Sequence, residues 1–176
     1  MDIKNICCFA LLSVLALAFD IVAIGTKSWA VTEGPSKVGL FLICIDRRCA
    51  SVLGRPIQFF VPLKAVTILL IISLLGIIIS VALALCSLLK YIPKLLTTAS
   101  ILLLLSGFSA LCGTAIFTVG MYIARNDVFM NAIFGNSKFG FSFAFAWACS
   151  GIAIVGGIFG LLIHKAKCKE RTDTVR

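Results

Sequence analysis

The sequence is poor in charged residues. Asp, Glu, Lys and Arg make up 13% of its 176 residues, about half of their usual share in a soluble domain. Hydrophobic residues make up 61%, and a soluble fold of this size has too little polar surface to cover them. The composition therefore excludes a soluble enzyme, a disordered regulator and a small secreted disulfide scaffold, and it points to a membrane protein.

Residues and motifs typical of catalysis are also scarce. His164 is the only histidine, and the eight cysteines are scattered, without a Cys-x-x-Cys pair or a zinc-binding spacing. The chain lacks the G-x-x-x-x-G-K-[ST], H-E-x-x-H and G-x-S-x-G motifs. We therefore predict a protein that is not an enzyme and has no catalytic residue, metal or cofactor.

The net charge is +9, but no motif for DNA or RNA binding accompanies it. In so apolar a chain, basic residues usually lie at membrane surfaces. We therefore expect a lipid bilayer, and no nucleic acid, as the partner of these charges.

Four long apolar stretches account for the composition. A helix needs about 20 apolar residues to cross the hydrocarbon core, where its backbone groups must be paired internally. We predict an all-α membrane fold, a bundle of four transmembrane helices in a single domain over 1–176. The expected segments are helices at 6–27, 65–89, 95–123 and 139–163, a first loop at 28–64, a second loop at 124–138, and a tail at 164–176.

The first stretch has an alternative interpretation as a removable signal peptide, because Ala23-Ile24-Gly25 resembles a cleavage site. Its length and the presence of Asp20 within it favour a retained helix. Four retained helices place both termini on the same side of the membrane.

The count of basic residues does not decide which side that is, because the 16 Lys and Arg residues divide eight to each side. Their density favours cytoplasmic termini, since Lys90 and Lys94 flank a very short loop and further lysines follow the fourth stretch. We therefore expect a multi-pass protein of the plasma membrane with cytoplasmic termini.

Cys44 and Cys49 give a second argument for this orientation. Their flanking residues favour two short strands joined by a four-residue turn, Ile45 to Arg48. A disulfide across this hairpin would need an oxidising compartment, which would place the first loop outside the cell. Two free thiols are the alternative.

The other cysteines divide by depth in the membrane. Cys86, Cys112 and Cys149 lie within predicted helices, where we expect small apolar packing residues. Cys7, Cys8 and Cys168 lie at helix ends on the side of the termini. There they are candidates for S-palmitoylation, with unmodified thiols as the alternative.

Trp29, the run Gly39-Leu40-Phe41, and the pair Cys44 and Cys49 follow one another in the first loop. In this order they resemble the first extracellular loop of the claudin-like tetraspan superfamily, which includes claudins, peripheral myelin and epithelial membrane proteins, and lens fibre membrane intrinsic protein. The short cysteine spacing is more similar to the lens protein than to tight-junction claudins.

The resemblance implies that the first loop forms a small extracellular antiparallel β-sheet. Trp29, Gly39, Leu40 and Phe41 would pack this sheet onto the helix ends, and Cys44 and Cys49 would be its disulfide. Phe41 departs from the family pattern, which has a second Trp there. The tail also lacks the terminal hydrophobic residue that PDZ domains capture, so we do not expect a PDZ scaffold as a partner.

Asp20 is the only acidic residue within a predicted helix. An intramembrane acid is by default a candidate functional site, and Lys27 and Lys64 are its possible partners. We expect a structural role, in which a neutral or paired carboxyl helps to hold the bundle. A place on a transport path is the alternative.

Both loops contain candidate contact residues. A basic group in the first loop would meet an acidic partner or anionic head groups, although a solvated turn is the alternative. Exposed apolar residues in the short second loop are typical of a contact site. The candidates are Arg47, Arg48, Arg55, Phe129 and Phe134.

Small residues recur at four-residue spacing in the helices, as in Gly156-x-x-x-Gly160. They let helix backbones approach closely, and we expect packing within the bundle, with oligomer contacts as the alternative.

These features lead to a functional hypothesis. The chain would organise cell–cell contact or membrane junctions through its extracellular loops, as a homo-oligomer or with a related tetraspan protein in cis or in trans. The first alternative is an auxiliary subunit of an ion channel or receptor. A paracellular or transmembrane pore is less favoured, because the helices carry no charge besides Asp20.

Overall fold

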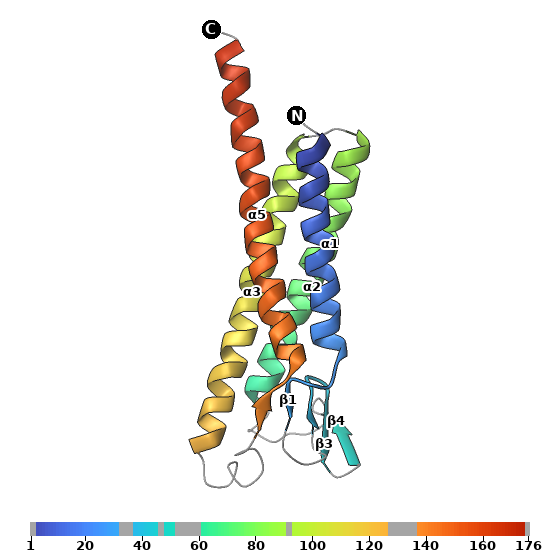
Figure 1. The fold of residues 1–176 in the computed structure, drawn as a ribbon, viewed down its shortest axis with the longest axis vertical. Coiled ribbons are helices and arrows are strands. Elements are labelled where there is room, and N and C mark those ends of the chain that lie inside the picture. The colour runs from blue at the N-terminus through green and yellow to red at the C-terminus, as the bar shows by residue number, and fades with distance from the viewer. Residues whose placement is uncertain are drawn as a thin grey trace.

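The computed structural model describes residues 3–31, 37–45, 48–51, 61–90, 93–126 and 137–174. Within these ranges four long helices run side by side (Figure 1): α1 (Ile3–Gly25), α2 (Val61–Lys90), α3 (Pro93–Asn126) and α5 (Phe141–Thr174). Each contains a segment that is long and apolar enough to cross a membrane. The chain is therefore a multi-pass membrane protein, as predicted.

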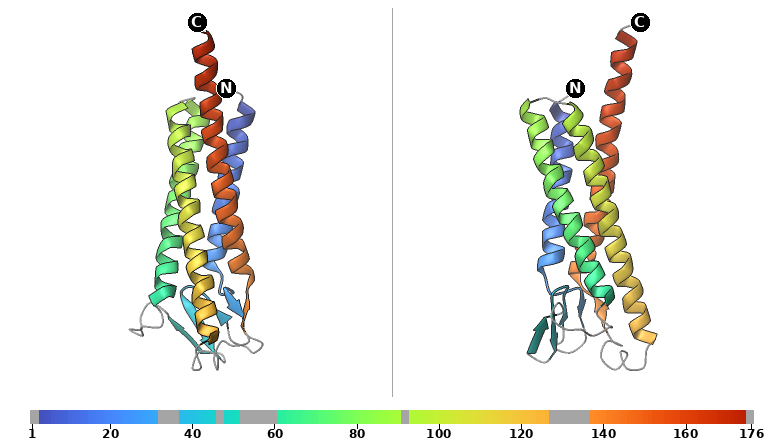
Figure 2. Two further views of the ribbon diagram at one scale, coloured as in Figure 1. Left: turned by 90° about the vertical axis from the view of Figure 1, so that its left-hand side faces the viewer. Right: turned by 180° about the vertical axis from the view of Figure 1, so that it is seen from behind.

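The helices form a bundle in which α1 packs against α2 and α5, and α3 packs against the same two helices. Both termini lie at one end of the bundle, and the strands lie at the other (Figures 1 and 2). We refer to these as the terminal end and the sheet end. At the terminal end α5 extends well beyond the other three helices (Figure 2).

Glycines let α3 and α5 approach closely. A Cβ added at Gly157 would lie 3.0 Å from both the Leu104 nitrogen and the Ser100 carbonyl oxygen. A Cβ at Gly156 would lie 3.1 Å from the Leu103 side chain, and one at Gly160 would lie 2.9 Å from Phe9. The small residues of α5 therefore allow helices of this bundle to pack closely against one another, as small residues do in other membrane helices.

The outward surface of the bundle is as apolar as its interior. Leu11, Leu105 and Val155 are 70%, 60% and 61% exposed, one on each of three helices. Lipid chains are a suitable environment for such side chains, so their exposure in the bundle is expected. Cys86 and Cys112 are exposed too, which corrects their predicted packing role; only Cys149 is buried. Cysteine behaves as a small apolar residue, so it can face either lipid or the interior of the bundle.

The sheet is antiparallel and has the order β4-β3-β2-β1-β5. Its strands are β1 (Ala30–Val31), β2 (Lys37–Val38), β3 (Leu42–Ile45), β4 (Arg48–Ser51) and β5 (Lys138–Phe139). The predicted fold class, four membrane helices with a small antiparallel sheet, is confirmed. The sheet is larger than predicted, because β5 comes from the segment just before α5 and not from the first loop.

The pairing of Ile45 with Arg48 agrees with the predicted four-residue turn, of which these are the first and last residues. Several other boundaries differ from the prediction. The fourth helix begins at Phe141 and not at 139, because Lys138 and Phe139 pair with β1. The first helix ends at Gly25 and not at 27, and the second begins at Val61 and not at 65.

The close approach at Gly157 predicts the effect of a single methyl group. We expect Gly157→Ala to lower the free energy of unfolding by about 1–3 kcal/mol, because the added Cβ would push on the backbone of α3. Thermal or chemical unfolding in detergent would measure the change.

Gly151 is the matched control, since a Cβ there would meet nothing within 4 Å. Gly151→Ala should leave stability unchanged or raise it, because Ala favours helix. Equal losses for the two variants would contradict the packing assigned to Gly157.

Candidate functional site

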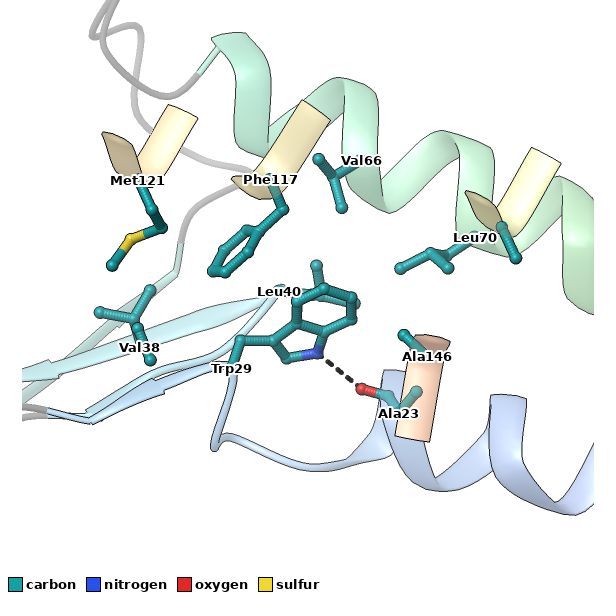
Figure 3. Close-up of a cluster of buried hydrophobic side chains, with 11 residues drawn as sticks. Ala23, Trp29, Val38, Leu40, Val66, Leu70, Phe117, Met121 and Ala146 are labelled. Atoms are coloured by element: carbon teal, nitrogen blue, oxygen red, sulfur yellow. Dashed lines mark hydrogen bonds between the residues drawn. The ribbon is translucent and has the colours of Figure 1, made fainter. Parts of the chain in front are cut away.

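The candidate site is the junction between the sheet and the helix ends, and Trp29 lies at its centre (Figure 3). Its side chain is completely buried, and its indole Nε1 donates a hydrogen bond of 2.7 Å to the Ala23 carbonyl oxygen. Ala23 lies in the last turn of α1, where the carbonyls lack partners within the helix. One bond thus satisfies both a helix-end carbonyl and a buried indole N–H.

Aromatic rings connect Trp29 to two other helices. Its ring lies edge-on to Phe117 of α3 at 4.9 Å and to Phe143 of α5 at 6.1 Å between centroids. Phe143 in turn stacks on Phe139 of β5 at 4.5 Å. Such pairs each contribute about 0.5–1.5 kcal/mol beyond the burial of their area. The cluster therefore ties α1, α3, α5 and the sheet together.

Backbone hydrogen bonds join the segment after α1 to the segment before α5. The Gly140 nitrogen donates to the Trp29 carbonyl at 2.9 Å, and the Ser142 nitrogen donates to the Ser28 carbonyl at 3.2 Å. The Ser142 hydroxyl also accepts from the Ser28 nitrogen at 3.2 Å and bonds the Thr26 hydroxyl at 2.5 Å. A Cβ at Gly140 would collide with the Ser28 backbone, so this crossing needs glycine.

The Gly39-Leu40-Phe41 run packs the sheet against the helix ends. The Gly39 nitrogen donates to the Leu42 carbonyl at 2.9 Å, and a Cβ on Gly39 would lie 2.9 Å from the Lys27 Cα. Leu40 is 1% exposed and belongs to the same apolar cluster as Trp29. Phe41 is partly buried and packs against that cluster, although it lacks the polar N–H of the family's Trp.

Cys44 and Cys49 form a disulfide between paired positions of β3 and β4. This confirms the predicted disulfide. The bond lies at the β4 edge of the sheet, which is the edge farthest from β5 in strand order.

Of the remaining predicted residues, none that the structure describes belongs to the apolar cluster around Trp29. Arg47, Arg55, Phe129 and Phe134 lie outside the described residues, and Arg48 begins β4. Lys64 lies in the first turns of α2 and is half-buried. Cys7 and Cys8 are exposed near the start of α1, and Cys168 lies where α5 extends past the bundle. These cysteines are therefore at the opposite end from the sheet.

Asp20 is completely buried in α1, and neither of its carboxyl oxygens has a hydrogen-bond partner. Neither proposed lysine forms a hydrogen bond with it. Among the described residues, no group of three or more His, Cys, Asp or Glu side chains is placed to bind a metal ion.

Sequence reasoning missed Phe117, Phe143, Gly140 and Ser142. The aromatic run at 139–147 was a signal for Phe143, but nothing marked Phe117 among the apolar residues of α3. The junction as a whole contains no pair of groups arranged for catalysis in the described part of the chain. It attaches the sheet to one end of the bundle.

A sequence model of one protein family, described as the PMP-22/EMP/MP20/Claudin family, matches residues 4–160. The match begins near the start of α1. It ends at Gly160, before the extension of α5. A comparison with individual curated proteins gives no match.

The Trp29 bond generates a prediction. Trp29→Phe keeps an aromatic ring but removes the N–H, leaving the buried Ala23 carbonyl without this donor. We expect a loss of about 1–3 kcal/mol in the free energy of unfolding, together with faster amide hydrogen exchange in β2 and β3.

Trp147→Phe is the control, because Trp147 lies on the outer face of α5 and is 41% exposed. It should change neither quantity much. Equal exchange rates in the sheet of the two variants would show that the indole does not hold the sheet.

Proposed function

Because the chain belongs to the PMP-22/EMP/MP20/claudin family, we propose that it organises contacts between cells or between packed membranes through the loops at its sheet end. In this proposal the sheet end lies outside the cell and both termini lie in the cytoplasm. The protein acts at the plasma membrane, at cell junctions, as a scaffold without an enzymatic step.

The observation that carries the proposal is the shared sheet. β1 pairs with β2 on one side and with β5 on the other, so the segments flanking both loops belong to one sheet. Trp29 and Gly140 fasten this sheet to three helices. Both loops are therefore held on one rigid base, which suits a surface that must present a fixed shape to a partner.

Two features support the orientation. The Cys44–Cys49 disulfide at the sheet end is stable in an oxidising compartment. At the terminal end, Lys90 and Lys94 flank the very short connection between α2 and α3, and such a density of basic residues favours the cytoplasmic side. Exposed Cys7 and Cys8 would then be accessible to S-palmitoylation in the cytoplasm, and Cys168 remains a further candidate.

The filled interior of the bundle favours a scaffold over a transmembrane pore. Trp29, Leu70 and Phe117 are buried and occupy the middle of the bundle at the sheet end (Figure 3). Protein interiors packed in this way leave no continuous water path. The proposed contacts are instead made by the loops.

The proposed contact residues are Arg47, Arg48 and Arg55 in the first loop and Phe129 and Phe134 in the second. Basic residues attract an acidic partner, and exposed aromatic rings supply contact area once water is excluded. The proposed partner is a second copy of the chain or a related tetraspan protein, in cis or in trans.

A mixed-cell assay tests the adhesive function. Cells that lack junctions and express the tagged protein are mixed with cells that do not express it. We expect enrichment of the protein where two expressing cells meet, and loss of that enrichment in Phe129→Ser/Phe134→Ser and in Arg47→Glu/Arg48→Glu at equal surface expression.

Lys37→Glu is the matched control for the charge reversal, because Lys37 is exposed on β2 of the same sheet but lies outside the proposed contact. It should keep the enrichment. Uniform distribution of the wild-type protein, with a stable complex to a channel or receptor after detergent extraction, would replace adhesion with an auxiliary-subunit function.

A further inference from the structure

The core of the bundle is divided into two apolar clusters. One cluster lies toward the sheet end and contains Trp29, and the other lies toward the terminal end and contains Phe9. Along α1, α2 and α3, one buried polar side chain falls between the last member of one cluster and the first member of the next. These side chains are Asp20, Ser73 and Ser106, with exposed fractions of 0%, 0% and 5%.

Two members of this polar layer are left unsatisfied. Neither carboxyl oxygen of Asp20 has a hydrogen-bond partner, and neither does the Ser73 Oγ. The Ser73 hydroxyl faces the carboxyl closely enough to interact with it, but outside good hydrogen-bond geometry. Ser106 differs, because its Oγ donates to the Leu102 carbonyl at 2.8 Å. The unsatisfied groups are thus an acid and a hydroxyl that face each other.

Among the described residues, no lysine or arginine forms a hydrogen bond with this acid. From α5 the Cys149 thiol lies near it and donates to the Ala16 carbonyl at 3.3 Å. From α2 the facing group is the Ser73 hydroxyl, and Lys64 lies nine residues before it, about 14 Å along the helix. Lys27 is exposed and lies two residues beyond the end of α1 at Gly25. The Ser106 hydroxyl of α3 lies against Gly76 of α2.

An ionised carboxylate in such a place costs several kcal/mol, so it must take up either a proton or a cation. A hard cation such as Ca²⁺ or Mg²⁺ takes about six or more oxygens. Among the described residues, the buried side-chain oxygens without a hydrogen-bond partner are the two carboxyl oxygens of Asp20 and the Ser73 hydroxyl. A proton needs a single acceptor for the resulting O–H group, and Ser73 supplies it.

We propose that Asp20 and Ser73 form a proton-binding site within the membrane, in which the protonated Asp20 carboxyl donates a hydrogen bond to the Ser73 hydroxyl. The bond joins α1 to α2 in the layer between the two apolar clusters. Loss of the proton would place a charge in that layer and weaken this joint.

Because of where the site lies, binding of the proton at Asp20 would also affect the junction around Trp29. Asp20 lies one helical turn before Ala23, whose carbonyl accepts the Trp29 indole N–H. A shift of α1 at Asp20 would therefore move the Ala23 carbonyl, and with it the hydrogen bond that attaches Trp29 and the sheet to the bundle. This inference depends on the bundle alone and holds whether or not the loops make adhesive contacts.

Infrared spectroscopy of the purified full-length protein in lipid nanodiscs tests the site. At pH 7 we expect the C=O band of one protonated carboxyl, which disappears in Asp20→Asn. Ser73→Ala should shift this band, because the carboxyl loses its acceptor. Ser106→Ala is the control and should leave the band in place, because its hydroxyl already bonds its own helix.

Absence of a protonated-carboxyl band in the wild-type protein at pH 7 would overturn the proposal. So would a wild-type melting temperature that rises when choline is replaced by sodium, because the site would then hold a cation. These two measurements use the unaltered protein and give an answer even where a variant fails to fold.

Discussion

The hydrogen bond from the Trp29 indole to the Ala23 carbonyl holds the rest of the sheet end in place. It forms where α1 ends and the chain leaves the bundle, so it sets the direction in which β1 begins. Once β1 is placed, β2 and β5 can pair on its two sides, and the ring can meet Phe117 and Phe143. Both loops depend on this bond, because both sheet edges extend outward from β1.

The interactions that join the helices of the bundle follow from the apolar lipid that surrounds them. Lipid chains are as apolar as the helix surfaces, so burial of leucine gives little force to join helices. The chain compensates with close backbone approach at Gly107 and Gly157 and with hydrogen bonds between helices, such as the Ser80 hydroxyl to the Ala99 carbonyl at 2.8 Å. Asp20 and Ser73 differ from these residues, since they are polar, buried and unsatisfied.

Some of the junction could be predicted from sequence and some could not. Trp29, Gly39, Leu40 and the disulfide pair stand in a recognisable order, and the structure brings them together. β5 was missed because a two-residue strand has no periodicity, and its partners Ala30 and Val31 are distant in the chain. In α3 the sequence gives even less indication of which residues are buried. Phe108 is 48% exposed, whereas Phe117 is 5% exposed. Both stand in equally apolar surroundings in the sequence.

The sequence by itself determined the four membrane spans, because only long uncharged runs can cross the hydrocarbon core and each must be a helix. It also determined the family and the disulfide pair. Only the tertiary structure decided which side of each helix faces lipid and which faces the bundle, because both environments are apolar and leave no amphipathic pattern. It likewise decided that β5 completes the sheet and that Ser73 faces Asp20, because these pairings join residues from different helices and loops.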